Sequence, residues 1–331
     1  MCHNFFYRFY SRLLHHPEQA PGQPSEFSQM RLFLVRHGET EHNVAGLLAG
    51  VSDSRLTNHG VLQTQRLGAY LATHRNLKLT HIFASDLQRA YLTAEEVRKH
   101  QSSRWADVHR VPDVVRLALL REQDFGSLEL VPWASRRAQS ALTPQHHDVQ
   151  DPHFRPQETK EAMTSRAEEF LINSVLPLLA TVSDHSDADL TPDCVAIVSH
   201  GLFLAVLWRT ILSKFRASSV RMGPEVDPVH HNKPLPYLPS WGNTSFLEVT
   251  IEARQHNRSI QGRELSPTTR DGDHPILNDR KLTIVTVNGR DHLAGLKRTR
   301  GGLGSTPHDE RQKRLDGFFK RPKATTDDSA T

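Results

Sequence analysis

The sequence predicts a three-layer α/β/α sandwich with a mostly parallel central sheet and helices on both faces. From residue 30 onward, short apolar runs alternate with segments in which apolar residues recur at helical spacing. Two of these runs, residues 32–35 and 195–198, end abruptly in polar and glycine residues. An α/β sheet presents reactive side chains in this way at the carboxyl ends of its strands.

Helices are expected after several of the strands. Residues 56–58 open the first helix, and Ser85 with Gln88 three residues later forms a capping box that predicts the start of the second. Residues 158–182 have the spacing of one long helix. Residues 201–212 are apolar almost all round, which is typical of a buried helix.

Two late strands are expected as partners, at residues 246–251 and 282–287, with a turn at Asn288 and Gly289. Together these elements predict one folded domain over residues 30–296. Three segments break its pattern and are expected to be surface insertions. They are residues 130–157, residues 219–240 with their five prolines, and residues 253–280.

The first 29 residues contain only two acidic residues and are expected to form a flexible extension. Met30 stands directly before the first strand, so an upstream start codon is one alternative. Arg8 and Arg12 lie among apolar residues, which leaves a targeting segment as another. Only two cysteines, Cys2 and Cys194, are present, and we expect a reducing location in the cytoplasm, the nucleus or both.

Composition excludes some function classes. No apolar run approaches the length of a membrane span, so we expect no membrane partner. The net charge is +4 in 331 residues, and the basic excess is local to the end of the chain, so direct nucleic-acid binding is not expected.

The triplet Arg36-His37-Gly38 ends the first strand and suggests chemistry on phosphate. A guanidinium binds phosphate oxygens in a fixed fork, and an imidazole nitrogen can attack phosphorus. Glycine lets the backbone approach a ligand closely. His200 and Gly201 repeat the pattern of a strand followed by His-Gly.

Two further segments follow apolar runs, namely residues 85–90 with Arg89 and residues 120–126 with Glu122. In this order the four motifs resemble those of the histidine phosphatase superfamily, the phosphoglycerate-mutase-like proteins. The resemblance spans roughly residues 30 to 300 and implies a phosphoglycerate-mutase-like fold.

The resemblance also implies the roles of individual residues. His37 would be the nucleophile, Glu122 the general acid and base, and His200 a donor to the transferred phosphoryl group. The phosphate or substrate would also be bound by Arg36, Asn43, Arg89, Gly201 and Asn243, with Thr244 beside the last. Clustered cations would keep His37 unprotonated. No cofactor and no metal ion are expected.

Some assignments stay open at this point. Glu122 could form a surface ion pair with Arg121, in which case Glu129 is a substitute acid. The superfamily usually has glycine where Leu130 stands, which leaves the pocket wall undefined. Asp124 places a negative charge where an acidic substrate would enter, which favours hydrolysis over mutase activity.

The expected function is therefore metal-independent hydrolysis of a small-molecule or phosphopeptide phosphomonoester through phospho-His37. A phosphoglycerate-type mutase is one alternative, and a non-catalytic protein that binds phosphate and the replication clamp is another.

Residues 297–331 are charged, poor in apolar residues and expected to be disordered. Within them, Gln312, Leu315, Phe318 and Phe319 match the motif Gln-x-x-Leu-x-x-Phe-Phe of proteins that bind the replication sliding clamp (PCNA). An amphipathic turn that packs on its own domain is the alternative. The flanking basic clusters, residues 297–300 and 320–323, also suit nuclear import.

Overall fold

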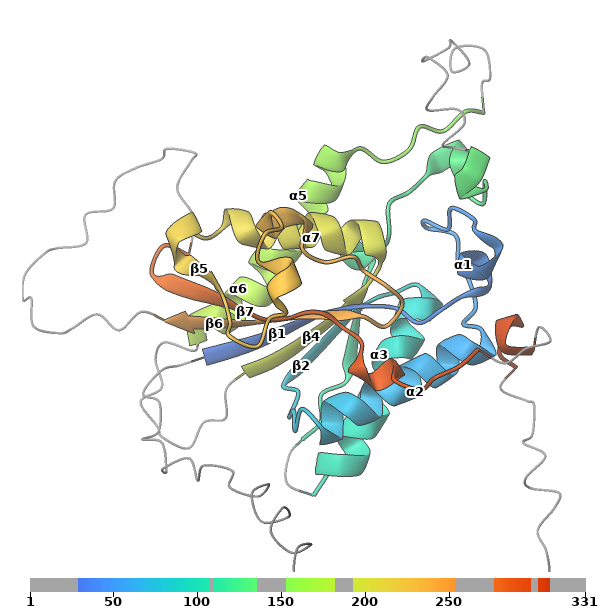
Figure 1. Ribbon diagram of the computed structural model, residues 1–331. Helices are drawn as coiled ribbons and strands as arrows, with labels where there is room; N and C mark the ends of the chain where they lie inside the picture. Colours follow the sequence, from blue (N-terminus) through green and yellow to red (C-terminus); the bar gives the residue numbers. More distant parts are fainter. Residues whose placement is uncertain are drawn as a thin grey trace, which may run out of the picture.

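The computed structural model describes residues 29–107, 110–135, 153–181, 193–253, 277–298 and 303–309. They form a seven-stranded sheet with the order β3-β2-β4-β1-β6-β7-β5 (Figure 1). The strands are β1 (Gln29–Arg36), β2 (His81–Ser85), β3 (Val114–Leu117), β4 (Asp193–Ser199), β5 (Val220–Met222), β6 (Phe246–Ala253) and β7 (Arg280–Gly289). Only β6 runs against the other six described strands, since it pairs antiparallel with both β1 and β7. The predicted mostly parallel sheet is confirmed.

Helices cover both faces of this sheet, as predicted. Helices α2 (Asn58–Thr73) and α3 (Gln88–Trp105) lie on one face (Figure 1). Helices α5 (Lys160–Phe170), α6 (Leu176–Thr181) and α7 (Gly201–Ser213) lie on the other (Figure 1). The short helix α1 (Glu41–Ala45) follows β1. Among the described helices, none is both long enough and apolar enough to cross a membrane.

Short 3₁₀ turns complete the described elements. They are η1 (Ala118–Leu120), η2 (Gly126–Leu128), η4 (Ala217–Ser219), η5 (Pro228–His230), η6 (Leu235–Tyr237), η7 (Asp291–Leu293) and η8 (Leu303–Ser305).

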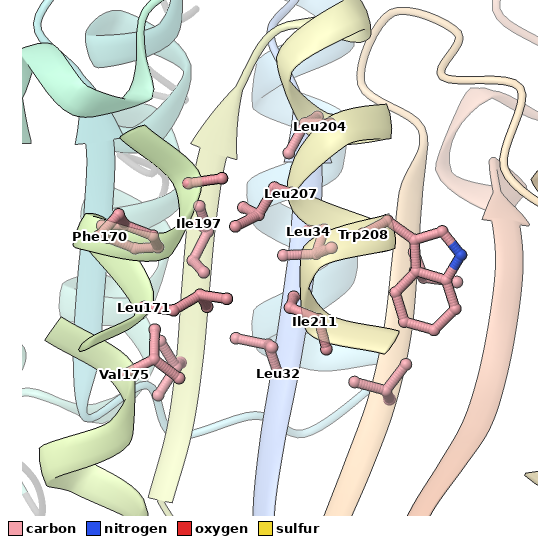
Figure 2. Close-up of a cluster of buried hydrophobic side chains, with 14 of the residues drawn as sticks. Leu32, Leu34, Phe170, Leu171, Val175, Ile197, Leu204, Leu207, Trp208 and Ile211 are labelled. Atoms are coloured by element: carbon pink, nitrogen blue, oxygen red, sulfur yellow. The ribbon is translucent and has the colours of Figure 1, made fainter. Parts of the chain in front are cut away.

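The apolar run of β1 is explained by burial on both sides of the sheet. Leu32 and Leu34 face the α5–α7 layer, where Figure 2 shows them packed with side chains of β4 and α7. Phe33 and Val35 face α2 and α3. Successive strand residues point to opposite faces, so a strand covered on both faces needs an unbroken apolar run.

The start of α2 is confirmed, whereas the predicted start of α3 is wrong in its mechanism. Thr57 caps α2, since its Oγ1 accepts a hydrogen bond from the Gly60 amide at 2.9 Å. Helix α3 has no side-chain cap from its own N-cap residue, Leu87. The Gln88 amide instead donates to the carboxylate of Asp53 at 3.1 Å, from a loop far away in the sequence.

The predicted long helix over residues 158–182 is interrupted by a π-helical turn, η3 (Leu171–Val175). There the Leu176 amide bonds the Leu171 carbonyl, five residues back. Pro177 follows directly, and proline has no N–H and clashes with the carbonyl four residues before it. A wider turn relieves this clash.

Residues 219–240 are not simply a surface insertion. They contain β5, which pairs with β7 at the sheet edge, and the buried side chains of Val226 and Leu238. The five prolines concealed this, because proline limits a segment to a short edge strand rather than excluding one. Of the other two expected insertions, residues 136–152 and 254–276 lie outside the described residues, as does the N-terminal extension up to residue 28.

The boundary of the tail at residue 297 also needs correction. Residues 303–309 dock at the start of α2, where the Asn58 amide donates to the Thr306 carbonyl at 3.1 Å and the His308 amide to the Leu56 carbonyl at 2.9 Å. Arg298 forms an ion pair with Glu39. These contacts are mostly polar, so hydrophobic composition could not predict them. Residues 310–331, with the clamp-binding motif, lie outside the described residues.

Candidate active site

Two histidines meet where neighbouring parallel strands end. Strand β1 pairs with β4 so that Arg36 lies opposite Ser199, which places His37 and His200 side by side one residue further on. Their ring centroids are 5.1 Å apart, and both side chains are buried. The two copies of the strand-His-Gly pattern in the sequence therefore belong to a single site.

The protonation of His37 suits a nucleophile. Its Nδ1 lies 2.7 Å from the Gly38 carbonyl oxygen. A carbonyl can only accept, so Nδ1 holds the hydrogen and Nε2 keeps its lone pair. Burial, reinforced by Arg36 and Arg89, holds the pKa of His37 well below its usual range, so the ring is neutral at pH 7.

His200 is the complementary hydrogen-bond donor. Its Nδ1 accepts a hydrogen bond from Arg89 Nε at 3.2 Å. The hydrogen of the neutral ring therefore lies on Nε2, which is buried and has no hydrogen-bond partner among the described residues. Burial is the main cause that holds the pKa of His200 well below its usual range, followed by Arg89.

Most of the hydrogen-bond donors of Arg89 bind protein acceptors in the wall of the site. Besides the His200 bond, its two Nη groups donate to the carbonyls of Ala49, Gly50 and Ser52 at 3.2, 2.6 and 2.8 Å. Burial lowers its pKa to about 10, so it stays charged at pH 7. The expected phosphate fork is thus largely occupied by one loop, and Arg89 contributes its charge and orients His200.

Arg36 has a donor that is not satisfied by the protein. Its Nη1 donates to the Trp241 carbonyl at 2.7 Å, whereas its buried Nε has no partner among the described residues. Gly201 lies beside it, and a side-chain Cβ there would be 3.6 Å from Arg36 Nε. Buried N–H groups are nearly always hydrogen-bonded. Arg36 Nε and His200 Nε2 are thus two donors suited to an anion.

A cavity at this edge of the sheet is lined by Glu122 together with Arg36 and His37. The alternative surface ion pair of Glu122 with Arg121 is wrong. Arg121 pairs with Asp86 at 2.6 Å. The Glu122 carboxylate instead accepts hydrogen bonds from the amides of Leu202 at 3.1 Å and Phe203 at 2.9 Å, in the first turn of α7. The Gln123 amide also donates to it at 3.1 Å, so three backbone donors fix the carboxylate in the cavity wall that His37 also lines.

Glu129 does not line the cavity, which argues against it as the substitute acid. Its two carboxylate oxygens accept hydrogen bonds from four backbone amides at 3.0–3.2 Å. Three of these amides belong to residues 50–52, so Glu129 shapes the loop whose carbonyls hold Arg89. Asp124 forms an ion pair with Arg155 at 2.6 Å. Because Arg155 balances its charge, Asp124 does not discriminate between hydrolysis and mutase activity.

The asparagines differ in their placement. Asn43 lines the cavity, and its Oδ1 accepts from the Thr40 amide and from Asn243 Nδ2. Asn243 Nδ2 also donates to the His37 carbonyl at 3.2 Å. Asn243 therefore supports the backbone of His37 rather than facing the cavity, and Thr244 beside it is fully buried.

Glycine is required at position 38 for packing against helix α2, rather than for the expected close approach to a ligand. A Cβ at this position would lie 2.7 Å from Thr64 Cγ2 and 3.0 Å from the Gly60 carbonyl oxygen. The close approach that requires glycine is thus to helix α2, which fixes the catalytic loop against this helix.

Comparison with known proteins decides the family. A family model described as "Histidine phosphatase superfamily (branch 1)" matches residues 32–225, more than half of the chain. The chain belongs to the histidine phosphatase superfamily. Membership makes it an enzyme of the phosphatase or mutase kind.

Named relatives of this superfamily member include both kinds of enzyme. The chain is 29% identical over 299 residues to the Schizosaccharomyces pombe protein "Probable phosphatase C1620.13", covering 89% of this chain and 81% of the relative. It is 34% identical over 184 residues to "Probable phosphoglycerate mutase GpmB" of Proteus mirabilis, covering 55% and 75%. A solved phosphoglycerate mutase from Bacillus anthracis shares the fold, with a TM-score of 0.50 at 18% identity over 82% of this chain and 98% of the mutase.

The rest of the cavity was not predicted from the sequence. Its volume is about 290 Å³, and besides the residues described above its wall contains mainly apolar side chains. The apolar ones are Leu47, Leu48, Ala49, Phe125, Trp133, Leu202, Ala205 and Trp241, and the uncharged polar residues Thr40 and Ser240 also line the cavity. Leu130, next to this wall, has φ +64°, a conformation that favours glycine and explains why the superfamily usually has glycine there.

Proposed function

We propose that this enzyme hydrolyses phosphomonoesters through a phosphohistidine on His37, without a metal ion. The main support is the set of complementary groups that the ends of strands β1 and β4 bring together. His37 Nε2 offers a lone pair, and Arg36 Nε and His200 Nε2 are buried donors without a protein acceptor among the described residues. A phosphoryl group needs a nucleophile in line and donors to its equatorial oxygens.

The reaction would proceed in two steps. His37 Nε2 attacks phosphorus, the bond from phosphorus to the alcohol oxygen breaks, and the Glu122 carboxyl donates its proton to the departing alcohol. The Glu122 carboxylate then takes a proton from water, which attacks the phosphohistidine and breaks its P–N bond. Phosphate leaves, and both side chains return to their initial states.

Hydrolysis is preferred to a mutase reaction because of the cavity wall. Among the described lining residues, the only cations are Arg36 and Arg89, and both lie at the phosphoryl end. A phosphoglycerate carries a carboxylate that needs a further cationic partner. The relative named as a phosphatase, which aligns with 89% of the chain, supports the same preference.

The test compares the full chain with its His37→Ala variant on p-nitrophenyl phosphate, with and without EDTA. We expect turnover that His37→Ala abolishes and EDTA leaves unchanged. Full activity in the variant, or loss with EDTA, would overturn the mechanism. Absence of turnover on every phosphomonoester would favour a non-catalytic phosphate-binding protein, and dependence on a bisphosphoglycerate primer would indicate a mutase.

We also propose that the C-terminal region binds the replication sliding clamp, which would require a nuclear location. The support is the match of Gln312, Leu315, Phe318 and Phe319 to all four fixed positions of the clamp-binding motif. The described segment 303–309, docked on α2, precedes this motif by two residues. A bound clamp would thus be tethered close to the catalytic domain.

Calorimetry of the full chain with purified clamp tests this partner. Each buried aromatic side chain contributes about 1.5–3 kcal/mol. The double change Phe318→Ala and Phe319→Ala should therefore move a micromolar complex beyond detection while phosphatase activity persists, because tenfold in affinity is about 1.4 kcal/mol. No clamp binding by the unchanged chain would overturn the proposal.

A further inference from the structure

Aromatic and aliphatic side chains make up much of the cavity wall. Trp133 lies at its mouth with 48% of its surface exposed, and Trp241 and Phe125 are buried in the wall. Leu47, Leu202 and Ala205 complete this apolar side. No charged side chain other than Arg36, Arg89 and Glu122 lines the cavity among the described residues.

Trp241 is held in place at a conformational cost. Its φ is +48°, a left-handed conformation that is costly for a bulky residue. In this conformation its carbonyl accepts the hydrogen bond from Arg36 Nη1. The same residue thus fixes a phosphate-binding arginine by its backbone carbonyl and also lines the cavity, so part of the apolar wall lies close to Arg36.

We propose that the substrate is the monophosphate of an uncharged, apolar or aromatic alcohol, rather than a phosphate with a second anionic group. This inference rests on the proposed function for the chemistry at His37. An apolar group gains free energy by leaving water for this wall, and aromatic groups gain further from contact with the indoles. A second carboxylate or phosphate would lose its hydration and find no cation among the described lining residues.

Substrates with leaving alcohols of similar acidity separate recognition from the chemical step. We expect kcat/KM for 2-phenylethyl phosphate to exceed that for 3-phosphoglycerate by at least about tenfold, equivalent to about 1.4 kcal/mol. Binding to the inactive His37→Ala variant, measured by calorimetry, should show the same preference without any turnover. Tighter binding or faster turnover of 3-phosphoglycerate would overturn the inference.

Variants then locate the recognition. Trp133→Ala should raise KM for 2-phenylethyl phosphate about tenfold at unchanged kcat, and leave methyl phosphate unaffected, because a methyl group does not reach the mouth of the cavity. Trp133→Phe should restore most of the loss. Tyr237→Ala is the matched control, since Tyr237 is 68% exposed and does not line the cavity. Equal effects of Trp133→Ala on both substrates would contradict the assigned role.

The two proposals fail in different ways. If no phosphomonoester is hydrolysed, the proposed function is wrong, and the binding preference of the His37→Ala variant still decides the substrate class. If p-nitrophenyl phosphate is hydrolysed but 3-phosphoglycerate is preferred over 2-phenylethyl phosphate, only the substrate class is wrong.

Discussion

Replacing Glu122 by glutamine should slow hydrolysis by an amount that depends on the leaving group. An alkyl alcohol must receive a proton as it departs, whereas p-nitrophenolate is stable as an anion. General acid catalysis contributes about 10²–10⁴-fold, so we expect a loss of about 100- to 1,000-fold on 2-phenylethyl phosphate. The loss on p-nitrophenyl phosphate should be less than about tenfold in the phosphorylation step.

The structure also gives the cost of this change to stability. Glu122 Oε1 accepts hydrogen bonds from the amides of Phe203 and Gln123, and Oε2 accepts one from the amide of Leu202. Glutamine keeps one acceptor oxygen for the amides of Phe203 and Gln123, and its NH₂ group would face the Leu202 amide. About one charge-assisted hydrogen bond is lost, which corresponds to about 1.5–3 kcal/mol of the free energy of unfolding. Urea unfolding measures this cost, and single-turnover kinetics on both substrates measure the rates.

Glu129→Gln is the matched control, because Glu129 accepts four backbone hydrogen bonds and does not line the cavity. This variant should lower the rates on both substrates by the same factor, since it disturbs the loop that holds Arg89 rather than the proton transfer. Equal losses on the two substrates in Glu122→Gln would refute the assignment of Glu122 as the acid.

Two further predictions concern stability. Leu130→Gly should raise the free energy of unfolding by about 0.5–1 kcal/mol in urea titrations, because φ is +64° and the side chain is 44% exposed; the helical control Leu62→Gly should lower it. Burial lowers the pKa of His292 to about 4, so from pH 6.5 down to about 4 the unfolded chain binds a proton that the folded chain does not. The free energy of unfolding should therefore decrease as the pH is lowered through this range, by up to about 1.4 kcal/mol per pH unit for this group. An unchanged dependence of the unfolding free energy on pH in His292→Gln would contradict this linkage.

The layers of the fold were predictable because the signals are local. The apolar run of β1 and the histidine after it are contiguous, and the repeated pattern at β4 meets it through strand register. The sequence also predicted that His37 and His200 follow parallel strands, and such strands end at one edge of a sheet.

The supports of the site were missed because they join distant segments without a local pattern. Asp53 caps α3 from another loop, and Glu129 binds the amides of residues 50–52. Neither residue type distinguishes these roles from those of an ordinary surface carboxylate. Trp241 was missed for a similar reason, since its position depends on a positive φ and on the bond to Arg36 that lies far away in the sequence.

The central claim is a covalent bond between phosphorus and His37 Nε2. Rapid acid-free quenching during turnover of p-nitrophenyl phosphate, followed by mass spectrometry and ³¹P NMR of the phosphoenzyme, tests it most directly. Because His37 Nδ1 donates to the Gly38 carbonyl, we predict phosphate on His37 at Nε2, and none in His37→Ala. Phosphate at Nδ1 or on another residue, or turnover in which rapid quenching never traps a phosphoenzyme, would contradict the account.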